Sequence, residues 1–515
     1  MIHHEMWRDE LQAWMVARDS DTLLGLFRNT RYEGHPPLWH FCLFLLSKVN
    51  SLPVMMQAFH LLIAAGSAFL ALRFAPFPRS LRVLFVFGYI PFYEFCVKSR
   101  GYALGVFLSF LFCVLLERLL RPDGSPPVTA PTTLGPKQIR HGTRPTPRSS
   151  VLLFGLILGM LCLTSVIGAF IAVGFAVVLA GRLHRGSSWQ LFLSRPDVLA
   201  GFLVFLVALA VSAFWMIPPA DGGYATETIL HFEAYRYASV ISRLTHAFLP
   251  LPSTVLEPTR TSWDHLAAYP ILCWSVAFFW RRRSIVLFYG LTTLALLTLL
   301  YVKYFGLFWH HAHFFLFWFL SLWLARQENP QSKVAPSLRR VGDWSIAAVL
   351  VVHAYTGIAA HVRDWKHPFS AGKATAAFLE GHRLARTIDD RSTTRDIPGT
   401  NSDDSQQWLL AGDLDFVAST VVGYLPVGQS MFYIAGERYG TFIRWDLDRL
   451  ERAQPGWEAA AAAAEEGYRR RLDVLFVSSY ELPGQPPNGV REVFRAQESI
   501  WPDERYHVYE VLLPR

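Results

Sequence analysis

Long runs of apolar residues, separated by short stretches rich in Arg, Pro and Gly, dominate the first 365 residues of the chain. A bilayer core about 30 Å thick is crossed by roughly 20 apolar helical residues, and a run such as 285–304 meets that length. The pattern therefore predicts a polytopic α-helical membrane protein with about 10–11 transmembrane or re-entrant helices. The expected helices cover residues 36–49, 54–73, 82–96, 101–120, 151–166, 167–181, 197–218, 268–280, 285–304, 307–325 and 342–361.

After residue 365 the long apolar runs stop, and shorter alternating patterns replace them. Residues 415–425 and the Ala-rich run 458–464 are typical of helices, and four other segments are typical of short strands. This mixture predicts a soluble α/β domain. Gly412 and Asp413 belong to no GxGxxG motif, so a dinucleotide site is not expected. The strand segments are WLLAG (408–412), MFYIAG (431–436), TFIRW (441–445) and DVLFVSS (473–479).

These patterns divide the chain into five parts. The segment before the first apolar run carries Leu11, Trp14 and Met15 on one face of a helix, so we expect it to lie on a membrane surface. A Pro-rich basic stretch without aromatic residues cannot bury enough surface to fold. The parts are an exoplasmic amphipathic loop (1–35), the first membrane helices (36–120), a disordered linker (121–150), the remaining membrane helices (151–365) and an exoplasmic or periplasmic α/β domain (366–515).

The formal net charge of +8 reflects membrane topology, because the basic clusters stand at the ends of apolar runs. The positive-inside rule places the linker, Arg182, the triplet 281–283 and the loop 326–340 in the cytoplasm, and everything after Trp365 outside the inner (plasma) membrane. A nucleic-acid partner is not expected. Eleven full crossings would separate the two ends of the chain, so one short segment must be re-entrant or merged with its neighbour.

The stretch DELQAWMVARDS (9–20) contains the first candidate for chemistry. Asp9 and Glu10 form a carboxylate pair that we expect to be solvated, ionised and close to lipid headgroups. In an inverting sugar transfer, one carboxylate takes the proton of the acceptor hydroxyl while basic groups neutralise the phosphate leaving group. Asp9 would be this base, and Glu10 its neighbour or a ligand for an acceptor or a metal ion. The alternative is an ordinary solvated helix face.

Three motifs resemble the GT-C superfamily of membrane glycosyltransferases: RDELQAW around Asp9 and Glu10, HPPLW at 35–39, and KSRGYALG at 98–105. The pattern is nearest the bacterial branch grouped with protein O-mannosyltransferases and the lipid A aminoarabinose transferase. The resemblance covers roughly residues 7–325 and implies polyprenyl-phosphate sugar donors. Members of this superfamily begin with a helix before the acidic loop, and the sequence MIHHEMWRDE contains neither such a helix nor a signal peptide. A missing first helix or a translocated N-terminus is therefore expected.

Arg100 and Tyr102 lie in a break between two apolar runs, where an Arg is costly unless it pairs or faces water. A guanidinium matches phosphate oxygens in a bidentate geometry, so Arg100, with Lys98 and Tyr102, is a candidate for binding the donor phosphate. The alternative is a loop charge that sets the topology.

The sequence WHHAHFF contains His310, His311 and His313. Only His310 and His313 can share a helical face, and no nearby carboxylate completes a zinc site. One or two of these histidines are expected to line the phosphate pocket, with interfacial packing as the alternative. The neighbouring aromatic residues Trp309, Phe314, Trp318 and Trp323 are expected to form an interfacial belt and to pack between helices.

Arg18, Glu33 and His35 are candidates for the acceptor side of the site. Pro36 and Pro37 fix the entry to the first apolar run, so simple loop geometry is the alternative for this segment.

These features favour a glycosyltransferase that moves a sugar from a polyprenyl-phosphate carrier in the bilayer to an envelope glycan, lipid or protein acceptor, with inversion. A divalent cation is an open alternative as a cofactor, and no other cofactor is expected. One rival hypothesis is a transporter or flippase for a lipid-linked substrate, which requires polar or broken helices at mid-membrane depth. The other is a non-catalytic envelope scaffold.

Overall fold

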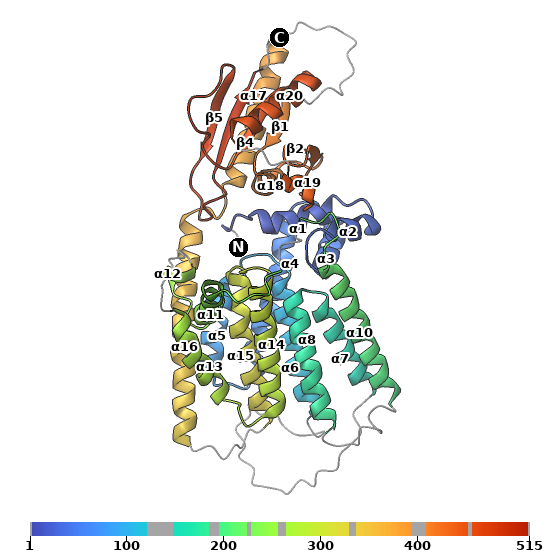
Figure 1. Cartoon of the computed structure of the whole chain (residues 1–515), viewed down its shortest axis with the longest axis vertical. Helices are drawn as coiled ribbons and strands as arrows, with labels where there is room; N and C mark the ends of the chain where they lie inside the picture. Colours follow the sequence, from blue (N-terminus) through green and yellow to red (C-terminus); the bar gives the residue numbers. More distant parts are fainter. Residues whose placement is uncertain are drawn as a thin grey trace.

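The computed structural model has a helical part and a sheet-containing C-terminal part, one above the other (Figure 1). It describes residues 3–120, 148–184, 195–223, 228–255, 264–328, 336–393, 408–451 and 456–512. The predicted linker at 121–150 lies outside these residues, except that α7 already begins at Arg148. The protein is therefore a membrane-type helical bundle joined to a C-terminal α/β domain, as the hydropathy pattern predicts.

Five helices in the described part of the chain are long and apolar enough to cross a membrane. Large apolar side chains on them face outward: Leu62, Leu203 and Leu294 are each more than 60% exposed. In a protein surrounded by water such a surface would be costly, whereas lipid covers it without penalty. The five are α4 (Val54–Phe74), α8 (Val166–His184), α10 (Pro196–Met216), α14 (Arg283–Val302) and α16 (Pro336–Lys366).

The remaining helices of the bundle fill the space between these five or cap one end. Among them, α15 is buried on all sides from Trp309 to Ala325, so its aromatic residues form the centre of the bundle. Of the two roles predicted for these aromatics, packing between helices is confirmed and the interfacial belt is wrong. The other elements are α3 (Leu38–Ser47), α5 (Arg79–Val86), the π-helical turn η1 (Tyr89–Glu94), α6 (Tyr102–Leu120), α7 (Arg148–Cys162), α11 (Ala234–Phe248), α12 (Pro252–Val255), α13 (Asp264–Ala277) and α15 (Phe308–Glu328).

Two of the predicted spans are shorter or more broken than expected. The run 36–49 forms α3, whose ten residues rise about 15 Å, half the thickness of a bilayer core. The run 82–96 is divided between α5 and η1, with Pro91 inside the π-helical turn. A helix as short as α3 does not need to cross the membrane. If it stays on one side, the parity conflict in the predicted topology disappears.

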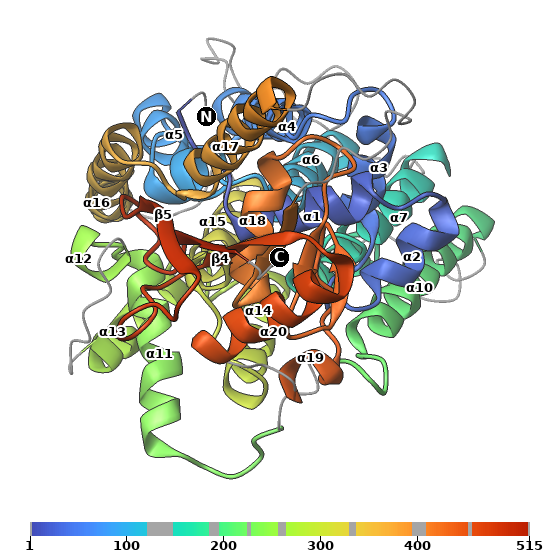
Figure 2. The same cartoon turned by 90° about the horizontal axis from the view of Figure 1, so that it is seen from above.

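The N-terminal segment forms α1 (Arg8–Arg18) and α2 (Leu23–Thr30). Residues Glu10 to Arg18 of α1 are all buried, and the helix packs against α3 on one side and the C-terminal domain on the other. Figure 2 shows α1 and α18 side by side above the bundle. The prediction that this helix lies on a membrane surface is therefore wrong, because its polar side chains are matched by partners within the protein.

The C-terminal domain is a six-stranded mixed sheet in the order β3-β2-β1-β4-β6-β5. β1 pairs in parallel with β2 and β4, and the outer pairs are antiparallel. The strands are β1 (Trp408–Gly412), β2 (Met431–Tyr433), β3 (Arg438–Gly440), β4 (Asp473–Ser478), β5 (Val490–Ala496) and β6 (Tyr506–Val511); the helices are α17 (Gly372–Thr393), α18 (Asp415–Tyr424), α19 (Leu447–Glu451) and α20 (Trp457–Arg470).

Most of the predicted elements of this domain are confirmed. The strand expected at 441–445 is wrong, since these residues form an irregular segment after β3. Gly412 has a packing role: a Cβ there would lie 2.4 Å from the sulfur of Met431 and 2.7 Å from Ala418. Asp413 accepts a hydrogen bond of 2.6 Å from the Tyr480 hydroxyl. The glycine is thus explained by the contact between β1, β2 and α18.

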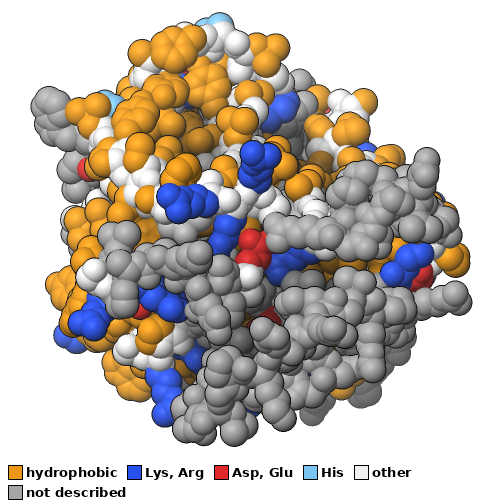
Figure 3. Space-filling model, turned by 90° about the horizontal axis from the view of Figure 1, so that it is seen from below, with side chains coloured by type: hydrophobic (Ala, Val, Ile, Leu, Met, Phe, Trp, Pro, Cys, Tyr) orange, Lys and Arg blue, Asp and Glu red, His pale blue; other side chains and the backbone are white. Residues whose placement is uncertain are grey.

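Lys and Arg side chains of the described residues lie at the end of the bundle away from the C-terminal domain. Figure 1 shows the end of α6 and the start of α16 there, and Figure 3 shows Lys and Arg side chains spread over this face. At the opposite end, α1 contacts α18 directly, so the N-terminal helices and the C-terminal domain share one side. This arrangement is compatible with the positive-inside pattern of the sequence.

Candidate functional site

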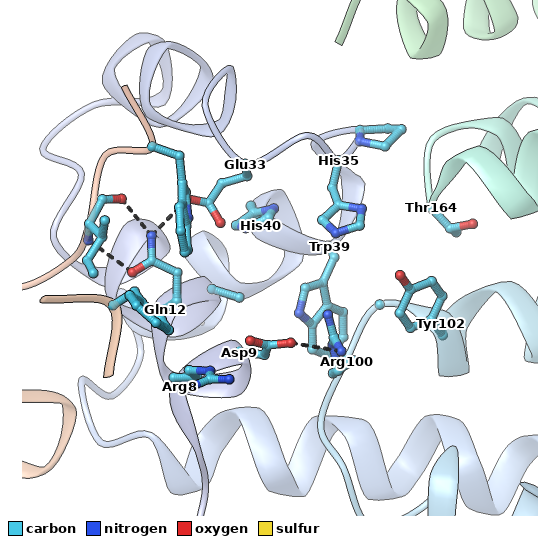
Figure 4. A pocket seen from close by; sticks show the side chains of 16 residues that line it. Arg8, Asp9, Gln12, Glu33, His35, Trp39, His40, Arg100, Tyr102 and Thr164 are labelled. Carbon is cyan, nitrogen blue, oxygen red and sulfur yellow. Dashed lines mark hydrogen bonds and ion pairs between the residues drawn. The ribbon is translucent and has the colours of Figure 1, made fainter. Parts of the chain in front are cut away.

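A cavity of about 130 Å³ lies where the helical bundle meets the C-terminal domain. It is smaller than the roughly 300–1,000 Å³ of sites that enclose a whole small molecule. It therefore suits one polar group of a larger ligand (Figure 4). Its lining comes from α1 (Arg8, Asp9, Gln12, Ala13), the loop after α2 (Glu33, His35, Pro36), α3 (Trp39, His40), the start of α6 (Arg100, Gly101, Tyr102), Thr164, and the C-terminal domain (Phe416, Ile443, Trp445).

Helix α1 brings Asp9 to this cavity because it is clamped between two apolar surfaces. On the domain side, Leu11 packs so closely against α18 that a Cβ on Gly423 would lie 2.8 Å from the Leu11 Cδ1 atom. Trp7, which precedes the first residue of the helix, and Trp14, in its middle, are fully buried. The position of Asp9 is thus fixed by core packing on either side of α1.

Asp9 and Arg100 both line the cavity and form an ion pair, with 3.0 Å between Oδ2 of Asp9 and Nη1 of Arg100. Arg100 also lies over the ring of Trp309, 4.5 Å from its centroid, and 5.3 Å from that of Tyr102. Burial alone would lower the pKa of Arg100, but the charge of Asp9 raises it above its ordinary value. The guanidinium is therefore a permanent cation at the mouth of the cavity, held by one carboxylate and two aromatic faces.

Glu10 lies elsewhere. It is fully buried, and its carboxylate accepts hydrogen bonds from the backbone N–H groups of Ser99 (2.5 Å) and Trp7 (3.3 Å). Burial alone would raise its pKa, but the charge and hydrogen bond of His4 and these N–H groups lower it. Glu10 does not line the cavity, so the prediction of a solvated carboxylate pair is wrong for this residue. Its contact with Ser99 positions the loop that carries Arg100.

His4 completes this buried cluster. Its Nε2 lies 3.0 Å from Glu10 Oε2, and its Nδ1 lies 2.9 Å from Asp364 Oδ2 near the end of α16. Burial alone would lower the pKa of His4, but the charge of Glu10 and hydrogen bonds to both carboxylates raise it to about 9. The protonated imidazole therefore joins α1 to the helix that leads into the C-terminal domain.

Lys98 is also away from the cavity. Its Nζ lies 3.0 and 3.1 Å from the two carboxylate oxygens of Glu94, and the residue is 7% exposed. Trp309 and Phe369 lie 5.5 Å from the ammonium group on either side. A lysine held in this way is a structural charge, so the structure gives no support to Lys98 as a phosphate ligand.

Tyr102 lines the cavity, and His310 lies behind it. The His310 Nδ1 atom accepts a hydrogen bond from the backbone N–H of Leu307 (3.0 Å), so in a neutral ring Nε2 carries the proton. Nε2 lies 2.9 Å from the Tyr102 hydroxyl oxygen and donates to it. The hydroxyl hydrogen of Tyr102 is thereby left to donate elsewhere. His310 orients Tyr102 and does not line the cavity itself.

The other two histidines of the cluster are further removed. His311 Nε2 lies 2.9 Å from the Phe305 carbonyl, and His313 Nδ1 lies 2.8 Å from that of Trp309. Both are buried within the bundle. Neither residue lines the cavity, so the predicted place of these two in the phosphate pocket is wrong, although the ring centroids of His313 and Tyr102 are 5.4 Å apart.

Glu33 and His35 do line the cavity, as the acceptor-side hypothesis expects. Glu33 Oε1 accepts a hydrogen bond of 2.8 Å from the Gln12 amide. Burial raises the pKa of Glu33 to about 7. The hydrogen bond from Gln12 opposes this shift, and the negative charge of Asp9 adds to it. Burial and the charge of Arg100 lower the pKa of His35 to about 4, so this ring is neutral. Arg18 is different: it pairs with Asp19 at 2.6 Å and does not line the cavity.

Sequence reasoning missed several residues of the site. Gln12 follows Asp9 by one helical turn, so a helical projection could have found it. Its amide donates to the Ile443 carbonyl (2.7 Å) and accepts from the Ile443 N–H (3.0 Å), which ties α1 to the C-terminal domain. Ile443 and Trp445 carry no sequence signal, because their approach to α1 depends on the docking of a domain 400 residues away.

The segment that carries Ile443 and Trp445 is also held from outside. Gly223 N–H donates to the Trp445 carbonyl (2.9 Å), and Arg444 pairs with Asp221 (3.1 Å). Tyr32 contributes hydrogen bonds to both members of this pair. We call Tyr32, Asp221 and Arg444 the clasp, since they fasten the cavity wall to loops of the membrane part.

Within the described residues, no group of three or more His, Cys, Asp or Glu side chains is arranged to hold a metal ion. No family model, no curated protein and no solved structure matches the chain. The fold and the apolar helices define the class: a multi-pass membrane protein with a C-terminal α/β domain and a cavity at the junction of the two parts.

Proposed function

We propose that this protein is a membrane glycosyltransferase that moves a sugar from a polyprenyl-phosphate-linked donor to an exoplasmic acceptor. The observation that carries the proposal is the ion pair between Asp9 and Arg100, two residues 91 positions apart that face one cavity. A carboxylate and a fixed guanidinium are the two groups that such a transfer requires from the protein.

In the proposed reaction the bond between the sugar C1 and the phosphate oxygen breaks, and its electron pair leaves with the phosphate. Arg100 stabilises the added negative charge, and the Tyr102 hydroxyl donates a hydrogen bond beside it. The acceptor oxygen forms a new bond to C1 from the opposite face, and Asp9 takes its proton. Single displacement inverts the configuration at C1. When the phosphate binds, it competes with Asp9 for Arg100 and releases the carboxylate to act as base.

The position of the cavity supports a lipid-linked donor. Its lining includes residues at the N-terminal ends of α3 and α6, and other lining residues belong to the C-terminal domain. A phosphate at this level would sit at the membrane surface with its polyprenyl chain in the bilayer. The transporter hypothesis is less favoured, because transporters bind substrates near the bilayer midplane and this cavity lies at one end of the bundle.

The proposed side of the membrane is the exterior of the inner (plasma) membrane. Lys and Arg side chains of the described residues lie at the far end of the bundle, and the positive-inside rule favours the cytoplasm for that end. The acceptor would then be an envelope glycan, lipid or protein, and the C-terminal domain would help to bind it.

The test is transfer from a panel of radiolabelled polyprenyl-phosphate sugars in membranes that contain the full chain. Asp9→Asn and Arg100→Ala should each lower transfer by at least about 100-fold at equal expression. Glu481→Gln is the matched control, because Glu481 is 61% exposed, does not line the cavity and pairs with Arg495. Absence of transfer by the wild-type protein from every donor, or equal transfer by Asp9→Asn, would refute the proposal.

A further inference from the structure

Two carboxylates line the same cavity in different electrostatic surroundings. Asp9 is paired with the guanidinium of Arg100 at 3.0 Å. Glu33 has no Lys, Arg or His within ion-pair distance among the described residues, and its one hydrogen bond comes from the neutral amide of Gln12. Figure 4 shows Glu33 beside His40, and Asp9 beside Arg100. When two carboxyl groups sit in environments this different, they suit different steps of a proton transfer.

The groups around Glu33 come from four segments. From α1, Asp9 adds a negative charge and Gln12 a hydrogen bond. From α3, His40 lines the cavity with both ring nitrogens unpartnered and only 4% of its surface exposed. His35 and Tyr32 stand beside Glu33 in its own loop, and the Tyr32 hydroxyl is committed to the clasp. From the C-terminal domain, Ile443 presents backbone groups that Gln12 already satisfies.

Gln12 fixes the orientation of the Glu33 carboxylate. Its amide nitrogen donates to both Glu33 and the Ile443 carbonyl, and its oxygen accepts from the Ile443 N–H. The side chain is therefore fixed, and it holds Oε1 of Glu33 while the second carboxyl oxygen remains available to the cavity. That oxygen and the ring of His40 are the polar groups on this side to which a proton can be passed.

We propose that Glu33 is the second carboxylate of the transfer reaction and stores the proton that Asp9 removes from the acceptor hydroxyl. This inference rests on the proposed function. The acceptor O–H bond breaks as the bond from oxygen to the sugar C1 forms, and the proton goes first to Asp9. It then passes to Glu33, the second carboxylate that lines the same cavity. Glu33 finally releases the proton to water as the products leave.

The electrostatics agree with this order of events. Burial raises the pKa of Glu33 to about 7, so the group gains and loses a proton easily at neutral pH. Glu33 must be ionised at the start of each cycle to accept the proton. The transfer rate should therefore rise with pH and reach half of its maximum near pH 7.

The experiment is the pH profile of sugar transfer, from pH 5 to 9, for the wild-type chain, Glu33→Gln, Glu33→Asp and the control Glu481→Gln. Glu33→Gln can still accept the hydrogen bond from Gln12, so its thermal stability should match the wild type. We expect its maximal rate to fall by at least 10-fold and its dependence on pH near 7 to disappear. Glu33→Asp should recover part of the rate with a midpoint displaced from that of the wild type.

The outcomes separate this inference from the function on which it rests. If Asp9→Asn abolishes transfer while Glu33→Gln keeps the wild-type rate and pH profile, the role of Glu33 is overturned and the glycosyltransferase proposal stands. If Glu33→Gln loses rate but keeps the midpoint near pH 7, another group stores the proton and the inference is again overturned. If the wild-type chain transfers no sugar, both fail together.

Discussion

The carboxylate of Glu10 accepts a hydrogen bond of 2.5 Å from the backbone N–H of Ser99, the residue immediately before Arg100. This hydrogen bond joins two segments that are almost 90 residues apart in the sequence. It lies next to Asp9 in the first segment and next to Arg100 in the second. The adjacent acidic residues therefore divide their roles: Asp9 faces the cavity and Glu10 holds the loop that brings its partner.

Glu10→Ala should lower the stability of the junction between the helical bundle and the C-terminal domain more than any substitution of a cavity-lining residue. It leaves the protonated His4 with only Asp364 and removes the acceptor for Ser99 N–H. Breaking a buried ion pair in this way costs about 3–5 kcal/mol. The measurement is thermal unfolding of the purified protein in detergent. Glu465→Ala, which removes the partner of Arg469 in a pair whose side chains are both more than 60% exposed, is the control and should cost less than about 1 kcal/mol.

The buried imidazole of His4 predicts that the junction weakens at alkaline pH. The pKa of His4 is about 9 in the folded protein and about 6.5 when unfolded. Its contribution is therefore fully present below about pH 6.5 and is lost as the pH rises through 9; the difference corresponds to roughly 3 kcal/mol. Protease sensitivity of the 366–372 connection should increase over this interval. A His4→Gln variant that shows the same increase would assign the effect to another group.

The hydrogen bond between His310 and Tyr102 predicts a shared effect on the donor. Tyr102→Phe removes the hydroxyl, and His310→Phe removes the group that orients it. Each change should weaken donor use by roughly 1–2 kcal/mol, about 10-fold, seen as a higher KM. The double variant should be no worse than the worse single one, because both changes remove one interaction. Additive losses would show that His310 acts independently of Tyr102.

The clasp is exposed, so it should be weak and sensitive to salt. Asp221 and Arg444 are 58% and 45% exposed, and surface pairs of this kind contribute about 0–1 kcal/mol. Asp221→Ala or 1 M NaCl should increase hydrogen exchange in residues 441–447 without changing the melting temperature of the whole protein. Exchange that stays at the wild-type level would mean that the backbone hydrogen bonds to Trp445 and Leu447 hold the cavity wall alone.

The sequence by itself determined the membrane class, most of the long helices and the central strands, because length and apolar periodicity act locally. It also pointed to Asp9, Arg100, Tyr102, Glu33 and His35, all of which line the cavity. Arg100 and Tyr102 stood in a break between apolar runs, where an unpaired Arg is costly, and the three others stood in the polar segment before the first run.

Only the tertiary structure decided which of the neighbouring candidates face the cavity. Glu10 and Lys98 differ little from Asp9 and Arg100 in local sequence, yet each has its partners inside the core. A single step along a helix or loop rotates a side chain from a cavity into the packed interior, and the domain that supplies Ile443 and Trp445 reaches α1 only by folding over it. Such long-range docking leaves no periodic trace in the chain, so its outcome depends on packing and electrostatic matching between distant segments.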